Sequence, residues 1–215
     1  MCKDCFRSLN FINNGCVKCG KTILNESVET ISPKNLLKEC PFCINKEYYF
    51  DKAIGCIEYN EVSKKIVFGF KYNDKTFMAK IIAKIMQEKL KTQNIDYDYI
   101  LYVPLHKKRE KRRGFNQAKL IARNLGKLEN KNVLDSIYRK KNTIKLFKLT
   151  NNERAKEVKG AFGCYDSINL CKYKKVLIID DIFTTGSTVN QISKVLKDKG
   201  VAKIYICTFL TKINY

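Results

Sequence analysis

The stretch from Val176 to Thr188 is the part of the chain with the most chemical content: Val-Leu-Ile-Ile-Asp-Asp-Ile-Phe-Thr-Thr-Gly-Ser-Thr. Its apolar start predicts a central parallel strand that is covered on both faces. Asp180 and Asp181 follow, and unpaired carboxylates are too costly to bury, so we expect both exposed at the strand's carboxyl end. Open α/β sheets bind ligands at that end. The pair suits sugar hydroxyls, or Mg²⁺ bound together with substrate oxygens.

A hydroxyl-rich turn that opens a helix comes directly after the acids, and it consists of Thr184, Thr185, Gly186, Ser187 and Thr188. Its backbone N–H groups, its hydroxyls and the helix dipole favour a phosphate. Gly186 would let the backbone approach that ligand closely. An ordinary strand–turn–helix, with Ser187 or Thr188 as the N-cap, shares part of this pattern. The apolar run, the two acids and the hydroxyls in register favour a ligand site.

Ten cysteines are present, and six of them form three Cys-x-x-Cys pairs. This spacing lets both sulfurs of a tight turn reach one ion at about 2.3 Å, and two such turns complete a tetrahedron. Buried packing cysteines would not fall into three equal pairs, so we predict structural Zn²⁺. Gly20 relieves the turn after the middle pair. The best ligand set is Cys16, Cys19, Cys40 and Cys43. As an alternative, the Cys2 and Cys5 pair replaces part of this set or extends it.

Two parts of the chain differ in their apolar patterning. Residues 1–50 hold too few large apolar residues for a core, and zinc binding worth on the order of 10–16 kcal/mol would stabilise so short a piece. We predict a zinc-ribbon module over residues 1–50, with residues 29–38 as the loop between its cysteine turns. Residues 51–215 alternate strand and helix patterns, which predicts a doubly wound, mostly parallel α/β sheet. The expected strands are 53–59, 99–103, 176–179 and 202–210, and the expected helices are 75–90, 115–128 and 189–196.

The chain is strongly basic. Lys and Arg number 42 against 21 Asp and Glu, a net charge of +21 that indicates a polyanionic partner. The 35 Lys and 19 Asn against only 7 Arg are also what AT-rich coding would give. However, residues 105–145 hold 14 Lys and Arg and 3 Asp and Glu, so they carry +11, about half of the excess. This concentration favours a binding face.

Membrane insertion and export are not expected. The longest apolar stretches are four or five residues, whereas a membrane span needs about 20. The first residues, Met1 to Cys5, show no apolar segment of a secretory signal. We therefore expect a cytoplasmic protein.

Two motifs resemble known families. The string from Val176 to Thr188 resembles the phosphoribosyl pyrophosphate (PRPP) motif of type I phosphoribosyltransferases. Val103-Pro104-Leu105-His106, followed by Arg109 and by residues 112–118 (Arg-Arg-Gly-Phe-Asn-Gln-Ala), resembles the signature of the ComF family of competence proteins. Members of that family join an N-terminal zinc ribbon to a phosphoribosyltransferase domain, which is the order seen here. Two departures are the absence of a further upstream Cys-x-x-Cys pair, and His106 where the family tends to have proline. Further stretches similar to that family are Arg139 to Thr143, Arg154 and Gly160-Ala161-Phe162.

The resemblance implies a type I phosphoribosyltransferase-like fold that binds PRPP with Mg²⁺. The two acids would orient the ribose, and residues 184–188 would bind its 5′-phosphate. Pro104 and Leu105 would belong to the loop that binds pyrophosphate. Arg109, Arg112 and Arg113 would stabilise the charge of that leaving group. The acceptor of the ribosyl group stays open.

The resemblance also implies work in natural transformation, with single-stranded DNA entering the cytoplasm beside a helicase and a membrane channel. Basic side chains would contact backbone phosphates, and Phe115 or a nearby tyrosine would stack on bases. The alternative is a catalytically active phosphoribosyltransferase in nucleotide or other metabolism without a role in DNA uptake. A purely structural zinc scaffold would leave the acids and the hydroxyl-rich turn unexplained. The basic residues meant here are Lys107, Lys108, Lys111, Arg112 and Arg113.

Overall fold

The structure is a computed structural model that describes residues 3–23, 40–44, 46–72, 75–143, 149–165 and 175–213. Cys2 and the predicted loop 29–38 lie outside these ranges. The elements are α1 (Lys3–Arg7), β1 (Lys52–Glu58), α3 (Glu61–Tyr72), α4 (Met78–Thr92), β2 (Tyr99–Tyr102), α5 (Lys107–Arg113), α6 (Gln117–Glu129), β3 (Ile137–Arg139), α7 (Asn151–Val158), β4 (Phe162–Cys164), β5 (Lys175–Phe183), α8 (Ser187–Asp198) and β6 (Lys203–Thr211).

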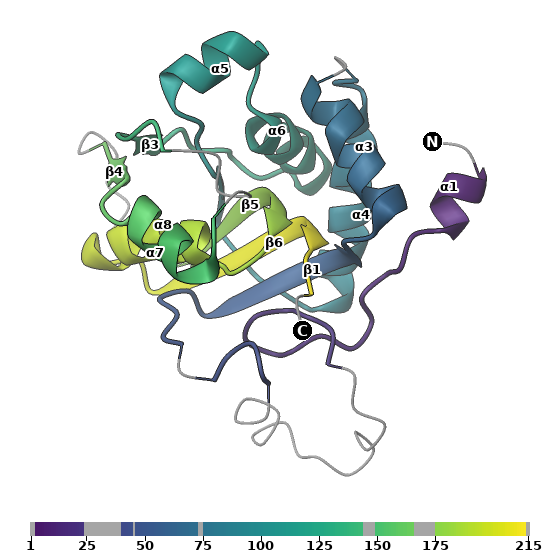
Figure 1. Cartoon of the computed structure of the whole chain (residues 1–215), viewed down its shortest axis with the longest axis horizontal. Helices are drawn as coiled ribbons and strands as arrows, with labels where there is room; N and C mark the ends of the chain where they lie inside the picture. The colour runs from purple at the N-terminus through teal and green to yellow at the C-terminus, as the bar shows by residue number, and fades with distance from the viewer. Residues whose placement is uncertain are drawn as a thin grey trace.

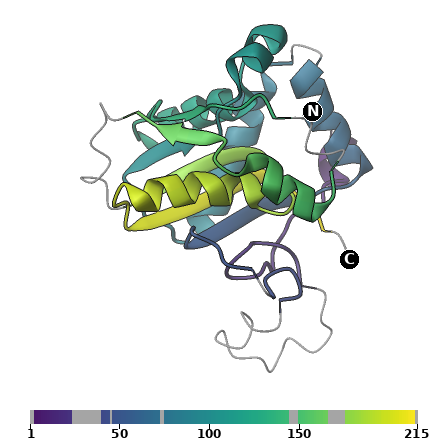
Figure 2. The same cartoon turned by 60° about the vertical axis from the view of Figure 1, so that its left-hand side comes forward.

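A four-stranded parallel sheet forms the centre of the molecule, in the order β1-β6-β5-β2. Its helices lie on two faces, with α4 and α6 on one side and α7 and α8 on the other (Figures 1 and 2). β5 is flanked on both sides, and its apolar residues from Val176 to Ile179 are fully buried. The predicted doubly wound parallel sheet is therefore confirmed, because a strand covered on both faces reads as a continuous apolar run.

The strand that carries the two acids is longer than predicted. β5 does not end at Ile179 but runs to Phe183, and it keeps its parallel pairing with β6 through Ile182↔Leu210 and Phe183↔Thr211. Asp180 and Asp181 therefore lie within the strand and are half-buried, not exposed at its end. The part of β6 that pairs with these residues is itself buried.

Several elements have no counterpart among the predicted ones. β3 and β4 form an antiparallel pair in the register Tyr138↔Gly163, and strands of three residues are too short to show a period. α5 has the sequence Lys-Lys-Arg-Glu-Lys-Arg-Arg and buries no residue, so it lacks an apolar stripe. α3 and α7 were likewise not predicted.

The cysteine-rich segment, by which we mean the described residues 3–23, 40–44 and 46–50, docks on the edge of the sheet. The Ala53 N–H donates to the Lys18 carbonyl at 2.8 Å, and the Ile12 N–H donates to the Cys56 carbonyl at 3.0 Å. These bonds cover β1, whose free edge would otherwise offer unpaired backbone groups. One cluster of buried side chains includes residues of this segment and of the sheet, and the division at residue 50 stays a prediction. No helix in the described ranges is long and apolar enough to span a membrane.

Candidate functional site

A cavity of about 310 Å³ opens beside the carboxyl ends of β2 and β5. Its charges are unbalanced, because seven cationic side chains face two carboxylates. Such an excess in a recess raises the local concentration of an anionic ligand. The seven come from α3, α5, the β3–β4 region, α7 and the C-terminal end of β6, and they are Lys71, Arg109, Arg112, Arg113, Arg139, Arg154 and Lys212.

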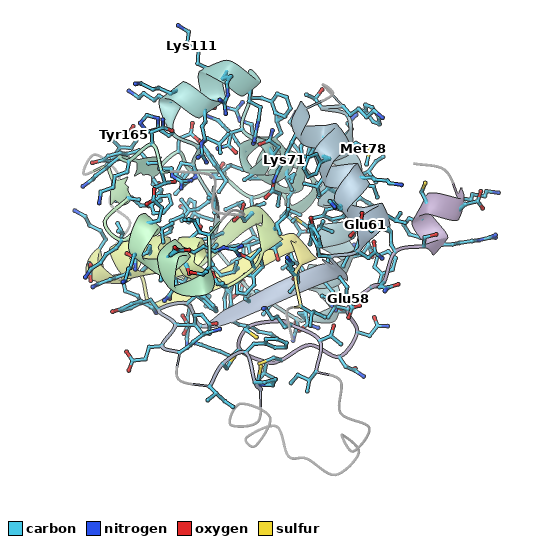
Figure 3. The ribbon with its side chains drawn as sticks, viewed as in Figure 1. Glu58, Glu61, Lys71, Met78, Lys111 and Tyr165 are labelled. Atoms are coloured by element: carbon cyan, nitrogen blue, oxygen red, sulfur yellow. The ribbon has the colours of Figure 1, made fainter. Side chains whose placement is uncertain are left out.

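The two acids differ in their surroundings. The Asp181 carboxylate pairs with the Lys71 ammonium at 2.5 Å, and the two side chains are 14% and 17% exposed. Figure 3 shows Lys71 on α3, facing the sheet. Burial and the charge of Asp181 raise the pKa of Asp180 to about 7, while Lys71 and Arg139 oppose that rise. Asp180 therefore holds a proton more readily than an ordinary carboxyl group does. A cationic or hydroxyl-bearing ligand would favour its ionised form.

The hydroxyl-rich turn links β5 to α8, and its glycine is required by geometry. Gly186 has φ of +80° and forms the N-cap of α8 without a side-chain capping bond, so neither Ser187 nor Thr188 is the cap. A Cβ at Gly186 would lie 2.8 Å from the Phe183 ring. The hydroxyl oxygens of Thr185 and Ser187 lie 2.8 Å apart. All five residues of the turn line a small hollow that Arg154 also lines, which is the donor set that a phosphate needs.

The loop after β2 and the start of α5 form the opposite wall. Leu105 lines the cavity, whereas Pro104 is buried and does not line it. His106 is the N-cap of α5, because its Nδ1 accepts a bond from the Lys108 N–H at 3.3 Å. The single histidine therefore has a structural role in this turn. Gly114, with φ of +84°, ends the helix.

The residues after α5 fasten this wall to the sheet. Asn116 is buried, caps α6 by accepting from the Lys119 N–H at 3.2 Å, and donates to the Val103 carbonyl at 3.1 Å. Gln117 accepts from Arg113 at 2.5 Å, and its buried Nε2 has no partner among the described residues. Gln117 lines the cavity. The Arg-Gly-Phe-Asn-Gln motif thus positions α5 and places a buried, unsatisfied donor at the wall of the cavity.

α5 has two faces with different surroundings. Arg109, Arg112 and Arg113 line the cavity, and the Arg109 guanidinium also donates to the Thr143 carbonyl. The lysines of the helix are exposed, and Figure 3 shows Lys111 pointing away from the body of the protein. The predicted pyrophosphate-binding arginines therefore gather at the cavity, and the predicted DNA-contacting lysines remain on the surface.

Arg139 and Arg154 line the cavity but were only noted in the sequence as family-like positions. Arg139 is buried, its guanidinium lies 5.2 Å from the centre of the Phe162 ring, and it donates to the Thr143 hydroxyl. Burial and the nearby Arg109 lower its pKa to about 10. Lys71 and Lys212 do not belong to any motif in the sequence. Their only available mark was a basic residue at the end of a helix or strand, which is too common to identify a site.

Four cysteines converge as predicted. The sulfurs of Cys16, Cys19, Cys40 and Cys43 lie within 4.8 Å of one another, with Cys16–Cys43 at 3.7 Å and Cys19–Cys40 at 3.8 Å. Tetrahedral zinc with bonds of about 2.3 Å places its sulfurs about 3.8 Å apart, so the group can hold a metal ion such as zinc. Cys5, predicted to replace or extend the set, lies on the exposed helix α1 and is not one of the four.

The chemistry of these thiols also favours a cation. Hydrogen bonds with the sulfurs of Cys16 and Cys19, together with burial, raise the pKa of Cys43 far above the usual thiol value. Several adjacent thiolates repel one another without a countercharge, and a divalent ion would supply it. Gly20, with φ of +70°, supports the turn after Cys19 as predicted; a Cβ there would lie 2.5 Å from the Ala53 carbonyl oxygen.

The cysteine-rich segment also contacts the hydroxyl-rich turn from behind. The Asn190 side chain, in the first turns of α8, accepts from the Tyr49 N–H at 2.7 Å and donates to the Glu47 carbonyl at 3.0 Å. The Tyr48 ring stacks on Phe50 with ring centres 4.6 Å apart. A Cβ at Gly186 would lie 3.3 Å from the Tyr48 ring. Residues 47–50 of the cysteine-rich segment therefore pack directly against α8 and the hydroxyl-rich turn.

Comparison with known proteins identifies the family to which the chain is similar. Residues 71–215 match the phosphoribosyl transferase domain family. The chain is 29% identical to Competence protein F of Haemophilus influenzae over 215 residues, covering 95% of this chain and 94% of that protein. It is 25% identical to Competence protein ComFC of Streptococcus pneumoniae, covering 95% and 84%. It is 23% identical to DNA utilization protein YhgH of Escherichia coli O6:H1, covering 96% and 88%.

The chain belongs to the phosphoribosyl transferase domain family, whose match covers more than half of its length. Its likeness to competence proteins F and ComFC extends over nearly the whole chain, cysteine-rich segment included. The ComF resemblance inferred from the motifs is thereby confirmed.

Proposed function

We propose that this protein binds PRPP with Mg²⁺ in the cavity between β2 and β5 and acts on single-stranded DNA during natural transformation. The proposal is carried by a cavity where two carboxylates and seven cations converge, together with an adjoining hollow formed by the hydroxyl-rich turn. The similarity to competence proteins over 95% of the chain supports the biological role. The resemblance extends the proposal to a helicase and a membrane channel as partners, with this protein in the cytoplasm.

The proposed ligand fits the side chains in one orientation. The 5′-phosphate lies in the turn of residues 184–188, and Asp180 and Asp181 accept hydrogen bonds from the ribose hydroxyls. The pyrophosphate then faces the arginines of α5. Mg²⁺, when bound with PRPP, supplies positive charge among the phosphate oxygens. This orientation puts the negative groups of the ligand against cations and its hydroxyls against the acids.

Calorimetric titration of PRPP with Mg²⁺ tests this placement. In Asp180→Asn, whose side chain keeps its size, we expect the affinity to fall by tenfold or more, because a charged acceptor is lost. Asp96→Asn is the matched control: Asp96 is an exposed carboxylate paired with Lys175 on the far part of the sheet, and its loss should leave the affinity unchanged. Equal affinities in the two variants would show that Asp180 does not contribute to the binding of PRPP.

The DNA-binding face is tested by the salt dependence of binding to a labelled oligothymidylate. Contact with about 4–6 phosphates predicts a logarithmic slope of about −3 to −4, at about −0.7 per phosphate. Replacing the exposed lysines of α5 by Gln should flatten this slope by about 2 units. An equally exposed triple on α4 serves as control. The two triples are Lys107, Lys108 and Lys111, and Lys80, Lys84 and Lys91; equal slopes would mean that α5 forms no DNA face.

The observation that favours turnover of PRPP is the set of cationic side chains from α5 on the wall opposite the phosphate hollow. Cations at that place stabilise the charge that develops on departing pyrophosphate. Release of pyrophosphate from PRPP, measured with candidate acceptors, tests this candidate function. Loss of that release in Arg112→Gln with retained binding of ribose 5-phosphate would assign the arginine to the leaving group.

A further inference from the structure

The β3–β4 pair presents different side chains on its two faces. Arg139, on the inner face, lines the cavity and lies against Phe162. Tyr138, Lys140 and Tyr165 alternate with these residues, and adjacent side chains of a strand point to opposite faces. The pair therefore separates the proposed phosphate site from an outer, tyrosine-bearing surface.

Two tyrosine rings lie against each other on that outer face in a tilted arrangement. The ring centres of Tyr138 and Tyr165 lie 4.6 Å apart at an interplanar angle of 36°. Tyr165 is 46% exposed, and Figure 3 shows it at the edge of the molecule. A Cβ at Gly163 would lie 2.6 Å from Cζ of Tyr138. The cross-strand glycine thus leaves room for the Tyr138 ring to lie over the backbone, where it supports Tyr165.

Two consecutive lysines lie in the segment that carries this aromatic pair. The Lys140 ammonium lies 5.8 Å from the centre of the Tyr138 ring. Lys141, the next residue, is exposed, and its ammonium donates to the Lys159 carbonyl at 3.1 Å. The bond from Arg109 to the Thr143 carbonyl ties the end of this segment to α5. The lysines of α5 and the tyrosine pair thus belong to neighbouring elements (Figure 1).

We propose that Tyr138 and Tyr165 form a stacking platform for the bases of single-stranded DNA, with Lys140 and Lys141 beside its phosphates. The proposal rests on the DNA-binding part of the proposed function and names the residues that recognise bases. Phe115, the aromatic residue considered from the sequence, is half-buried with its ring centre 5.9 Å from that of Phe70, so it is occupied by packing.

The chemistry selects a single strand as the occupant. An exposed aromatic face beside ammonium groups matches a chain that presents both π-faces and phosphates, and each stacked base contributes about 1–3 kcal/mol, which is about 5-fold to 150-fold in affinity. In a duplex the bases already stack on one another. The platform therefore favours unpaired DNA of any sequence over duplex DNA.

Binding of two labelled strands of equal length tests the platform: an oligothymidylate and an abasic strand with the same phosphates. In Tyr165→Leu we expect affinity for oligothymidylate to fall about fivefold or more and affinity for the abasic strand to stay the same. Tyr165→Phe keeps the aromatic ring, so this variant should bind oligothymidylate as tightly as the unaltered protein does. Tyr49→Leu is the matched control, because Tyr49 is 40% exposed and has the Lys194 ammonium 5.6 Å from its ring centre.

A fluorescence readout keeps the test independent of affinity. The chain contains no Trp, so Tyr165→Trp introduces a unique fluorophore that a stacked base would quench. We expect oligothymidylate to quench it, and expect neither the abasic strand nor Tyr49→Trp to show this effect.

Three outcomes overturn the proposal. Equal binding of the two strands by the unaltered protein would exclude base stacking while leaving the phosphate contacts of the proposed function intact. Equal losses in Tyr165→Leu and Tyr49→Leu would show a general surface effect. No binding of either strand would contradict the DNA-binding part of the proposed function together with the platform.

Discussion

The cysteine centre and the ligand cavity represent two ways of gathering reactive side chains in one chain. Four thiols converge in the first, with sulfur–sulfur distances that one tetrahedral ion would satisfy. In the second, seven cations face two carboxylates, and one of the latter already pairs with Lys71. A metal ion would complete the first centre, whereas the charges of the second would stay uncompensated until an anionic ligand binds.

The cysteine centre would contribute to folding stability, whereas the cavity would contribute to ligand binding. Residues 3–23, 40–44 and 46–50 have a small share of the buried core, so we expect a metal to supply much of their folding energy. The cavity rests on a complete parallel sheet, so its charges can remain unsatisfied without unfolding the domain. Asn190 and Tyr48 join the two regions. Substitutions in either region should therefore change stability and ligand binding, but by different amounts.

Removal of the metal should have the largest effect. We expect Cys16→Ser to lose bound zinc and to destabilise the protein by several kcal/mol, because the ion supplies the stability of the cysteine-rich segment. Elemental analysis and denaturant unfolding measure the two effects. Cys207→Ser, a buried thiol of β6 outside the cluster, should keep its zinc. A metal-free protein that remains fully folded would refute the structural role of the ion.

Breaking the ion pair in the cavity should have the next largest effect. Asp181→Asn leaves the Lys71 ammonium unpaired at low exposure, so we expect a loss of about 2 kcal/mol in the free energy of unfolding. Lys71→Met combined with Asp181→Asn should recover part of that loss, which a double-mutant cycle measures. Simple additivity of the two changes would show that the pair contributes nothing to stability.

The pH dependence of stability should identify Asp180. Its folded pKa of about 7 lies above the ordinary value of 3.8, so the folded state holds this proton more tightly than the unfolded state. Stability from this group is therefore full below about pH 4 and declines as the pH rises toward about 7. In the same range, PRPP affinity should rise, because the ligand favours the ionised carboxylate. Asp181, Lys71 and Arg139 are the charged neighbours that set this balance.

Unfolding measured from about pH 4 to 8 in Asp180→Asn checks this assignment, since the variant should lose that part of the decline. The unaltered protein and the variant should differ most above about pH 7. Parallel curves for the two proteins would place the proton on another group.

The contact between the two regions should give the smallest effect. Asn190→Ala removes two hydrogen bonds to the cysteine-rich segment, and we expect about 1 kcal/mol of destabilisation with a threefold or so weaker binding of phosphate ligands. Asn124→Ala, which removes a bond within α6, is the control and should leave phosphate binding unchanged. If both variants bind phosphate alike, the segment does not support the turn.

Local sequence patterns predicted both centres because their key residues lie within short stretches. The cysteine spacing identified the four converging thiols, and the acids with the following turn identified the cavity edge. Lys71, Arg139 and Arg154 reach the cavity from elements without a strong pattern, so only the three-dimensional arrangement reveals them. The same limit explains the length of β5, which continues past its apolar run because β6 pairs with it.

The central claim is that one cavity recognises both ends of PRPP, and calorimetry with three ligands tests it most directly. Ribose 5-phosphate should engage the turn of residues 184–188 and the acids, and pyrophosphate should engage the arginines of α5. PRPP with Mg²⁺ should bind the unaltered protein at least tenfold more tightly than either fragment, because it makes both sets of contacts within one molecule. PRPP bound no more tightly than pyrophosphate, or bound equally without Mg²⁺, would contradict the account.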